Sequence, residues 1–236
     1  MAPRASATVL LAAALVTAVA AAAVNAAAGG ISEADVLLAF RDTLRGPQGV
    51  PPALPGWSSS AAPCTGASRR SPWQGVVCNA QQQVLVLLLE GLGLQGGAPD
   101  LGLLAPLPGL RSLSLAGNNL TGAFPDLSAL PYLKMLYLSW NGLAGEIPGA
   151  AFAPTRGLQK LHLEENAFAG TIPSSLASLR NLMELNLSDN NLSGPIPEGL
   201  RKFGAAIFQG NAGLCGSPLN TQCNQTVSPP SPPPSS

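Results

Sequence analysis

Leucines recur through the middle of this chain in a pattern that combines a short alternation with a longer period. The clearest copy spans residues 110–125 and reads L-R-S-L-S-L-A-G-N-N-L-T-G-A-F-P. Leucine at every second position predicts a short strand that buries one face. An earlier, degenerate copy covers residues 84–96, with Leu92 in the place of the asparagine. The asparagines of the four clear copies lie 23, 25 and 24 residues apart: Asn118, Asn141, Asn166 and Asn190.

A period of 20–29 residues with this spacing is typical of the leucine-rich repeat. A lone strand cannot bury its leucine face, whereas stacked copies bury a continuous apolar column. We therefore predict an α/β solenoid of about five to six leucine-rich repeats over residues 83–203. Each asparagine falls where a strand ends, so its amide can pair with backbone groups of the turn, and stacked copies predict a ladder.

The flanking segments divide the rest of the chain. Residues 1–28 have a short basic start, an Ala/Leu/Val run and small residues for cleavage. They predict a secretory signal peptide rather than a membrane anchor, because the run is short and rich in alanine. No later segment is long and apolar enough to span a bilayer. Residues 29–82 are the predicted N-terminal cap, residues 204–224 the C-terminal capping segment, and the Pro/Ser-rich residues 225–236 a disordered linker.

A helix is predicted near the start of the N-terminal cap. Ser32 followed by Asp35 fits a capping box. Gly46-Pro47 ends the helical pattern. The apolar residues between these signals lie on one helical face, which predicts a helix packed against the repeats: Val36, Leu37, Phe40 and Leu44.

Four cysteines flank the repeats in two local pairs. Cys64 and Cys78 precede the repeats, and Cys215 and Cys223 follow them. In a secreted chain they predict two disulfides, which would close caps over the apolar ends of the solenoid. Metal ligation is the poorer alternative, because the spacings are not C-x-x-C and the single histidine, His162, lies within the repeats. We expect no metal and no cofactor.

Charge and sequons bear on the partners. Twelve basic and twelve acidic residues balance, so no basic field points to nucleic acid. Asn119 and Asn191 both follow a ladder asparagine directly, and that repeat position is expected to be exposed. The sequons of the chain predict N-glycosylation at four sites: Asn119, Asn186, Asn191 and Asn224.

The non-leucine positions of the strands define a candidate binding face. Equivalent positions on stacked strands lie about 4.8 Å apart, so aromatic and charged residues of neighbouring repeats come together. Exposed aromatics beside charges favour a peptide or protein partner, and the excess of acid, including Glu164 and Glu184, favours a basic one. A solvated sheet face is the alternative, and a glycan on Asn186 would cover part of it. The candidate ligand-binding residues are Tyr137, Trp140, Lys160, His162, Glu165 and Asp189.

The caps and repeats resemble a plant leucine-rich repeat receptor ectodomain. S-E-A-D-V-L-L-A-F-R-D-T-L at 32–44 and W-Q-G-V-V-C at 73–78 resemble the plant N-terminal cap, and G-x-I-P at Gly145, Gly170 and Gly194 is the plant repeat form. The finer resemblance is to the pollen receptor-like kinases. It rests on four segments: L-E-G-L-G-L-Q-G at 89–96, L-x-x-L-P-G-L-R-S-L-S-L at 104–115, I-P-S-S-L-A-S-L at 172–179 and F-Q-G-N-A-G-L-C-G-S-P-L at 208–219.

The resemblance implies a receptor module for small secreted peptides, with a receptor-kinase co-receptor as a second partner. It also implies a location that is secreted or at the extracellular face of the plasma membrane. In that family a transmembrane helix and a kinase-like domain follow the ectodomain. This chain has no Gly-rich phosphate loop followed by V-A-I-K, no H-R-D and no D-F-G, so kinase activity is not expected.

Two other function classes remain open. A hydrolase would need paired carboxylates across a cleft, and Glu165 and Asp189 near His162 are more often plain surface charge. A secreted inhibitor of cell-wall-degrading enzymes, resembling the polygalacturonase-inhibiting proteins, shares the repeat type but usually has about twice as many repeats. We predict a non-catalytic extracellular module that binds a peptide or protein.

Overall fold

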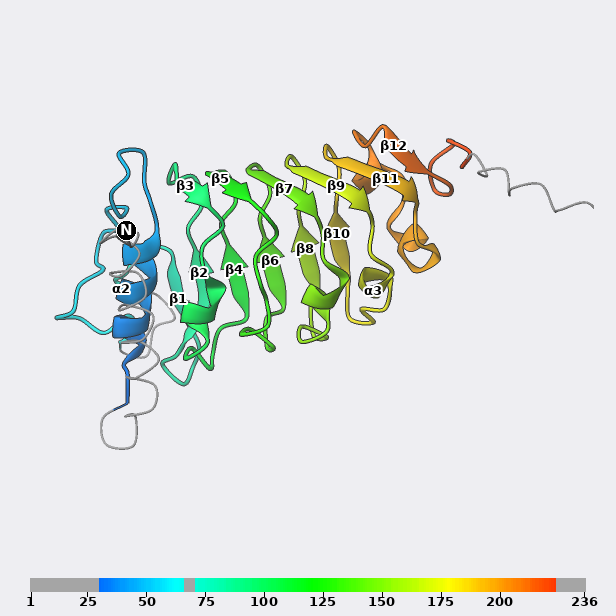
Figure 1. Cartoon of the computed structure of the whole chain (residues 1–236). Helices are drawn as coiled ribbons and strands as arrows, with labels where there is room; N and C mark the ends of the chain where they lie inside the picture. The colour runs from blue at the N-terminus through cyan, green and yellow to red at the C-terminus, as the bar shows by residue number, and fades with distance from the viewer. Residues whose placement is uncertain (1–29, 66–70, 224–236) are drawn as a thin grey trace, which may run out of the picture.

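Two sheets, parallel apart from one strand of the cap, lie on two sides of a solenoid in the computed structural model, which describes residues 30–65 and 71–223 (Figure 1). The predicted signal peptide, the linker and Asn224 lie outside these residues. The first sheet has the order β1-β2-β4-β6-β8-β10. Its strands are β1 (Val76–Cys78), β2 (Val84–Leu88), β4 (Ser112–Ser114), β6 (Met135–Tyr137), β8 (Lys160–His162) and β10 (Glu184–Asn186).

Each strand from β2 to β10 contributes one leucine to a continuous buried column across the first sheet. From β2 through β4, β6 and β8 to β10, each strand pairs in parallel with the next, and one leucine from each strand stands in register. Every one of them is at most 4% exposed: Leu87, Leu113, Leu136, Leu161 and Leu185. The predicted repeat strands and their register are therefore confirmed. β1 adds to β2 in the antiparallel direction and belongs to the cap.

The second sheet was not predicted from the sequence. Its strands are rich in glycine and small polar residues, which have low strand propensity. Stacking supplies each segment with a neighbour of the same shape, and the backbone bonds between them form the sheet. The order is β12-β11-β9-β7-β5-β3. The strands are β3 (Gln95–Gly97), β5 (Asn119–Gly122), β7 (Gly142–Glu146), β9 (Ala167–Thr171), β11 (Asn191–Pro195) and β12 (Gly213–Cys215).

Short helices complete the turns on the remaining side of the coil. After η1 (Leu101–Leu104) come η2 (Gly149–Phe152) and α3 (Ser174–Ala177), and η3 (Glu198–Phe203) and η4 (Ala206–Phe208) follow the last strand of the first sheet. Each places one or two apolar side chains in the core, among them Phe152 and Leu176.

The asparagine ladder is present, and the structure extends it by one residue. Asn118 accepts from the backbone N–H groups of Leu92 and Leu94 at 3.0 and 3.1 Å and donates to the carbonyls of Leu89 and Leu115 at 2.8 Å. Each ladder residue thus satisfies backbone groups of its own repeat and of the preceding one. Asn211 continues the pattern beyond the predicted repeats by accepting from Leu192 N–H and donating to Leu187 carbonyl oxygen.

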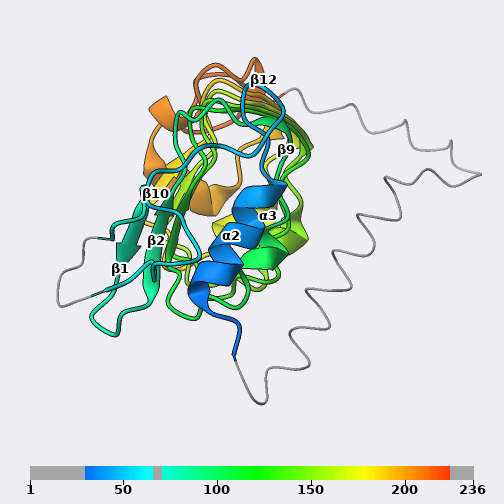
Figure 2. The same cartoon turned by 90° about the vertical axis from the view of Figure 1, so that its left-hand side faces the viewer.

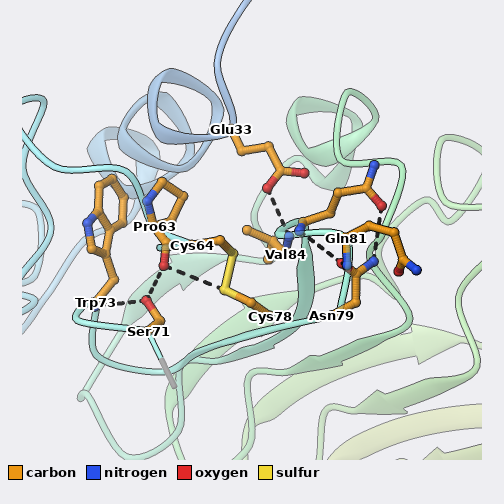
Figure 3. The surroundings of a disulfide bond; sticks show 10 residues. Glu33, Pro63, Cys64, Ser71, Trp73, Cys78, Asn79, Gln81 and Val84 are labelled. Carbon is orange, nitrogen blue, oxygen red and sulfur yellow. Dashed lines mark hydrogen bonds between the residues drawn. A yellow bond between two sulfur atoms is a disulfide. The ribbon is translucent and has the colours of Figure 1, made fainter. Parts of the chain in front are cut away.

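The N-terminal cap closes the open end of the repeats. Its helix α2 (Glu33–Thr43) lies across that end (Figure 2). The capping box of Ser32 and Asp35 is formed, and the four predicted apolar residues are buried. The helix ends at Thr43, three residues before Gly46, with Leu44 as its C-cap. Glu33 fastens the helix to the first repeat, because its Oε2 accepts from Val84 N–H at 2.8 Å (Figure 3).

Both predicted disulfides are formed. Cys64–Cys78 ties the cap loop to β1, and Cys215–Cys223 closes the C-terminal segment after β12. Figure 3 shows the first of these between Pro63 and the strand that carries Cys78. Within the described ranges, no helix has the length and apolar character needed to cross a membrane.

Candidate ligand-binding face

The outward positions of the first sheet form two columns of side chains. Met135, Lys160 and Glu184 stand in register in one column. Tyr137, His162 and Asn186 stand in register in the next. Because side chains alternate along a strand, these residues lie opposite the buried leucines and face away from the core.

His162 is the centre of a charged cluster on this face. Its ring lies 5.0 Å from the Tyr137 ring, centroid to centroid. Its Nδ1 is 3.3 Å from Glu164 Oε1, and its Nε2 is 3.7 Å from Glu184 Oε2. Lys160 Nζ approaches the other oxygen of Glu184 at 2.6 Å. We predicted one neighbourhood of Tyr137, Trp140 and His162, and the contact between Tyr137 and His162 is present.

The carboxylates stabilise the charged form of the histidine. The hydrogen bond that His162 donates to Glu164 raises the pKa of His162 above 6.5, against the opposing effect of partial burial, and the charges of Glu164 and Glu184 add to the rise. The hydrogen bond with Lys160 lowers the pKa of Glu184 and raises that of Lys160. Lys160, one of the candidate ligand-binding residues, is thus paired with an acid of the same face.

A second row of candidate residues lies just past the strand ends. Trp140, Glu165 and Asp189 each precede a ladder asparagine and have φ values of 57°, 55° and 53°. Gly91, Gly117 and Gly210 hold the same conformation at the equivalent position of other repeats, with φ values of 64°, 66° and 73°. The backbone of each non-glycine residue is pinned by a bond to the next repeat, as in Trp140 N–H to Glu164 carbonyl oxygen at 3.0 Å.

The predicted residues thus form two adjacent groups on one edge of the repeats. Tyr137, Lys160 and His162 belong to the interacting cluster on the strands. The row of Trp140, Glu165 and Asp189 lies beside it. Trp140 is 60% exposed, which makes it an uncommon surface residue. Sequence reasoning named Glu164 and Glu184 as nearby acids, but their direct contacts with His162 required the structure.

The face is less polar toward its N-terminal side, which the sequence analysis did not anticipate. Leu88 is 39% exposed there, although it is a large apolar residue on the first repeat strand. Ser112 and Ser114 point outward but are buried, because the larger side chains of the neighbouring strands β2 and β6 flank them. Tyr137 Oη lies 3.8 Å from Met135 Sδ across this region. The face therefore combines an apolar part with a charged part.

The three described sequon residues differ in their surroundings. Asn119 and Asn191 are exposed on the second sheet, at the start of β5 and of β11. Asn186 is partly buried on β10, and its Oδ1 accepts from Ser188 N–H at 3.1 Å. Glycosylation stays a prediction at all of them. Over the described ranges, no group of three or more His, Cys, Asp or Glu residues is arranged to hold a metal ion.

These features define a leucine-rich repeat solenoid with disulfide-closed caps. Residues 31–79 match the family described as "Leucine rich repeat N-terminal domain", and three segments match the family "Leucine Rich Repeat": 109–129, 157–179 and 181–203. The BIR2 ectodomain from Arabidopsis thaliana is 32% identical, with a TM-score of 0.69 over 82% of this chain and 100% of that one. The chain therefore belongs to the plant leucine-rich repeat receptor ectodomains.

The sequence relatives include pollen receptor-like kinases. Pollen receptor-like kinase 2 of Arabidopsis thaliana is 39% identical over 216 residues, which cover 83% of this chain and 32% of the relative. The chain thus spans about a third of the length of the curated relatives that it matches.

Two solved complexes contain similar ectodomains. The complex of BIR3 and SERK2 from Arabidopsis thaliana matches at 36% identity and a TM-score of 0.66, over 80% of this chain and 98% of that one. The Arabidopsis receptor kinase HAESA, in complex with the peptide hormone IDA and the co-receptor SERK1, matches at 34% identity and a TM-score of 0.62, over 71% of this chain and 27% of that one.

Proposed function

We propose that this chain is a non-catalytic extracellular module that binds a basic peptide or a basic loop of a secreted protein on the first sheet. The observation that carries the proposal is the charged cluster around His162 beside the row of Trp140, Glu165 and Asp189. Four carboxylates stand on this edge, and Lys160 and His162 offset part of their charge. A basic ligand is therefore favoured, mainly through a faster encounter.

Trp140 supplies the apolar anchor in this proposal. Large aromatic side chains contribute most of the binding energy at many protein interfaces. Its exposure and its left-handed backbone, which costs about 1–3 kcal/mol in a bulky residue, fit a side chain retained for contact with a partner rather than for folding. Tyr137 and the apolar part near Leu88 extend the contact area.

A receptor-kinase co-receptor is the second partner in the proposal, which gives the module a role in cell-surface signalling. Support comes from the similar ectodomains that occur in complexes with SERK proteins and with a peptide hormone. The pollen receptor-like kinases among the relatives support a receptor role of the same kind. The proposed location is the extracellular face of the plasma membrane or the secreted space.

A selection from a random peptide library tests the proposal. The secreted chain should enrich peptides with basic and apolar residues, whereas the Glu165→Lys/Asp189→Lys variant should lose them. Glu198→Lys, an exposed acid on η3, is the matched control and should keep the selected peptides. For a selected peptide, the double variant should slow association and flatten its salt dependence without changing the melting temperature. Selected peptides without an excess of basic residues would contradict the proposal. So would a double variant and a Trp140→Ala variant that bind the peptides as well as the unmodified chain does.

A further inference from the structure

A cavity of about 510 Å³ lies at the edge where the strands of the first sheet begin, opposite the edge that carries Trp140. It is formed between η2 and α3, which belong to consecutive repeats (Figure 1 shows α3). Phe152 and Leu179, which are 2% and 6% exposed, lie at its base, and Arg156, Arg180 and Asn181 line the rest of it. Its size lies within the range of sites for small ligands.

The two arginines occupy the same position in consecutive repeats. Arg156 and Arg180 each stand two residues before the leucine that opens the pattern, Leu158 or Leu182. Stacking therefore places the two arginines on adjacent turns, and both line the same cavity. Asn181 Nδ2 donates to the carbonyl oxygen of Arg156 at 3.2 Å, which ties the two turns together.

The positive charge of this cavity is not neutralised by the protein. The ion pairs formed among residues 30–65 and 71–223 include neither arginine. The residues that line the cavity contain no carboxylate. Arg156 Nε donates to Ala153 carbonyl oxygen at 3.3 Å, which leaves both terminal amino groups of this guanidinium for a ligand. Ser175 Oγ is already engaged, because it donates to Gly149 carbonyl oxygen at 2.8 Å.

We propose that this cavity binds an oxyanion, namely a carboxylate, sulfate or phosphate group, between Arg156 and Arg180. A guanidinium presents a planar fork of donors that matches two oxygens of such a group. This site is independent of the basic ligand proposed for the first sheet, since it has the opposite charge and lies at the opposite edge.

Titrations with sodium sulfate, sodium phosphate and sodium acetate test the proposal, at an ionic strength held constant with sodium chloride. We expect saturable binding of at least one of them, followed by NMR of the arginine Nε–H signals. The Arg156→Gln/Arg180→Gln variant should weaken it by about tenfold or more. Saturation by acetate alone identifies a carboxylate as the ligand, and saturation by sulfate or phosphate identifies a tetrahedral anion.

Two further variants separate a built site from general positive charge. Lys134→Gln/Arg201→Gln removes the same charge from exposed positions outside the cavity and should leave the binding unchanged. Arg156→Lys/Arg180→Lys keeps the charge but lacks the fork, so it should bind more weakly than the unmodified chain. All four substituted side chains are exposed, so melting temperatures in chloride should agree. Non-saturating shifts that chloride reproduces, or undiminished binding by the double glutamine variant, would overturn the proposal.

Discussion

Trp140, Glu165 and Asp189 occupy a backbone position where other repeats have glycine. The left-handed conformation costs an ordinary residue about 1–2 kcal/mol, because Cβ approaches the following carbonyl oxygen. All three belong to the proposed binding row, and backbone strain of this kind is often found at functional sites, where a particular side chain is needed. The row is thus a place where stability and binding should be separable by mutation.

Glu165→Gly should therefore stabilise the protein, although glycine usually destabilises. Relief of the left-handed strain outweighs the entropy cost of glycine by about 0.5–1 kcal/mol. Ala167→Gly is the control, since Ala167 lies in β9 without a positive φ, and it should destabilise by about 0.5–1 kcal/mol. Denaturant unfolding measures both changes. A loss of stability in Glu165→Gly as large as that in Ala167→Gly would show that the position is not strained.

His162 should make stability depend on pH in one direction. Its pKa in the folded protein is raised above 6.5, chiefly by the hydrogen bond that it donates to Glu164. The folded state therefore holds this proton more tightly than the unfolded state, and the resulting stabilisation is present below pH 6.5. It is lost as the pH rises through the folded-state pKa.

A comparison with His162→Asn measures this contribution. The unmodified protein should lose unfolding free energy relative to the variant between pH 6.5 and the folded-state pKa, and Glu164→Gln should reduce the loss. NMR titration of the histidine Cε1 proton gives the pKa directly, because the chain has a single histidine. Parallel stability curves for the two proteins would contradict the predicted linkage.

At the scale of single elements, each strand of the first sheet divides its residues between core and surface by alternation. In the segment around β8, Leu161 and Leu163 are fully buried, whereas Lys160, His162 and Glu164 face outward. A shift of one residue would exchange these sets, so the register is strongly specified. The leucines therefore position the binding residues as well as the core.

Leu163→Asp should prevent stable folding. It removes a fully buried side chain and places a carboxylate without a partner in the apolar column, at a cost of about 4 kcal/mol or more. Met183→Asp is the matched control, because Met183 is 62% exposed, and it should change stability little. Secretion yield and circular dichroism report the difference. A Leu163→Asp protein that unfolds cooperatively at the normal temperature would mean that the register is wrong.

At the scale of the whole molecule, the solenoid contacts are made between neighbours, so its stability depends on its ends. The N-terminal end is covered by α2 (Figure 1). Cys64–Cys78 cross-links this end, and Cys215–Cys223 cross-links the C-terminal end. The two cross-links close loops with sequence separations of 14 and 8. Either end can open without the other.

Removing the N-terminal cross-link should cost more than removing the C-terminal one. The chain-entropy model gives about 3 kcal/mol for Cys64→Ala/Cys78→Ala and about 2.5 kcal/mol for Cys215→Ala/Cys223→Ala. Hydrogen exchange should rise first in the repeats next to the altered cap, because contacts are local. Uniform loss of protection along the chain in either variant would show that the solenoid opens as one unit.

The sequence by itself determined the repeat, its register, the ladder asparagines except Asn211, and the two disulfides. These features follow from spacing, since leucine alternation and a period near 24 residues specify which side chains are buried. Local signals also determined α2, because Ser32, Asp35 and the apolar face lie within one helix. The membership of Tyr137 and His162 in one neighbourhood followed from the same register.

Tertiary structure alone decided the remaining features, because they depend on contacts between repeats rather than within one. The second sheet arises from partners that each glycine-rich segment finds in its neighbours. The pairing of Lys160 with Glu184, and of His162 with Glu164, depends on rotamers that spacing does not specify. The unneutralised pair of Arg156 and Arg180 emerges when α3 stacks beside η2. The burial and the ion pairing of these residues depend on contacts between neighbouring repeats, so the sequence of a single repeat does not predict them.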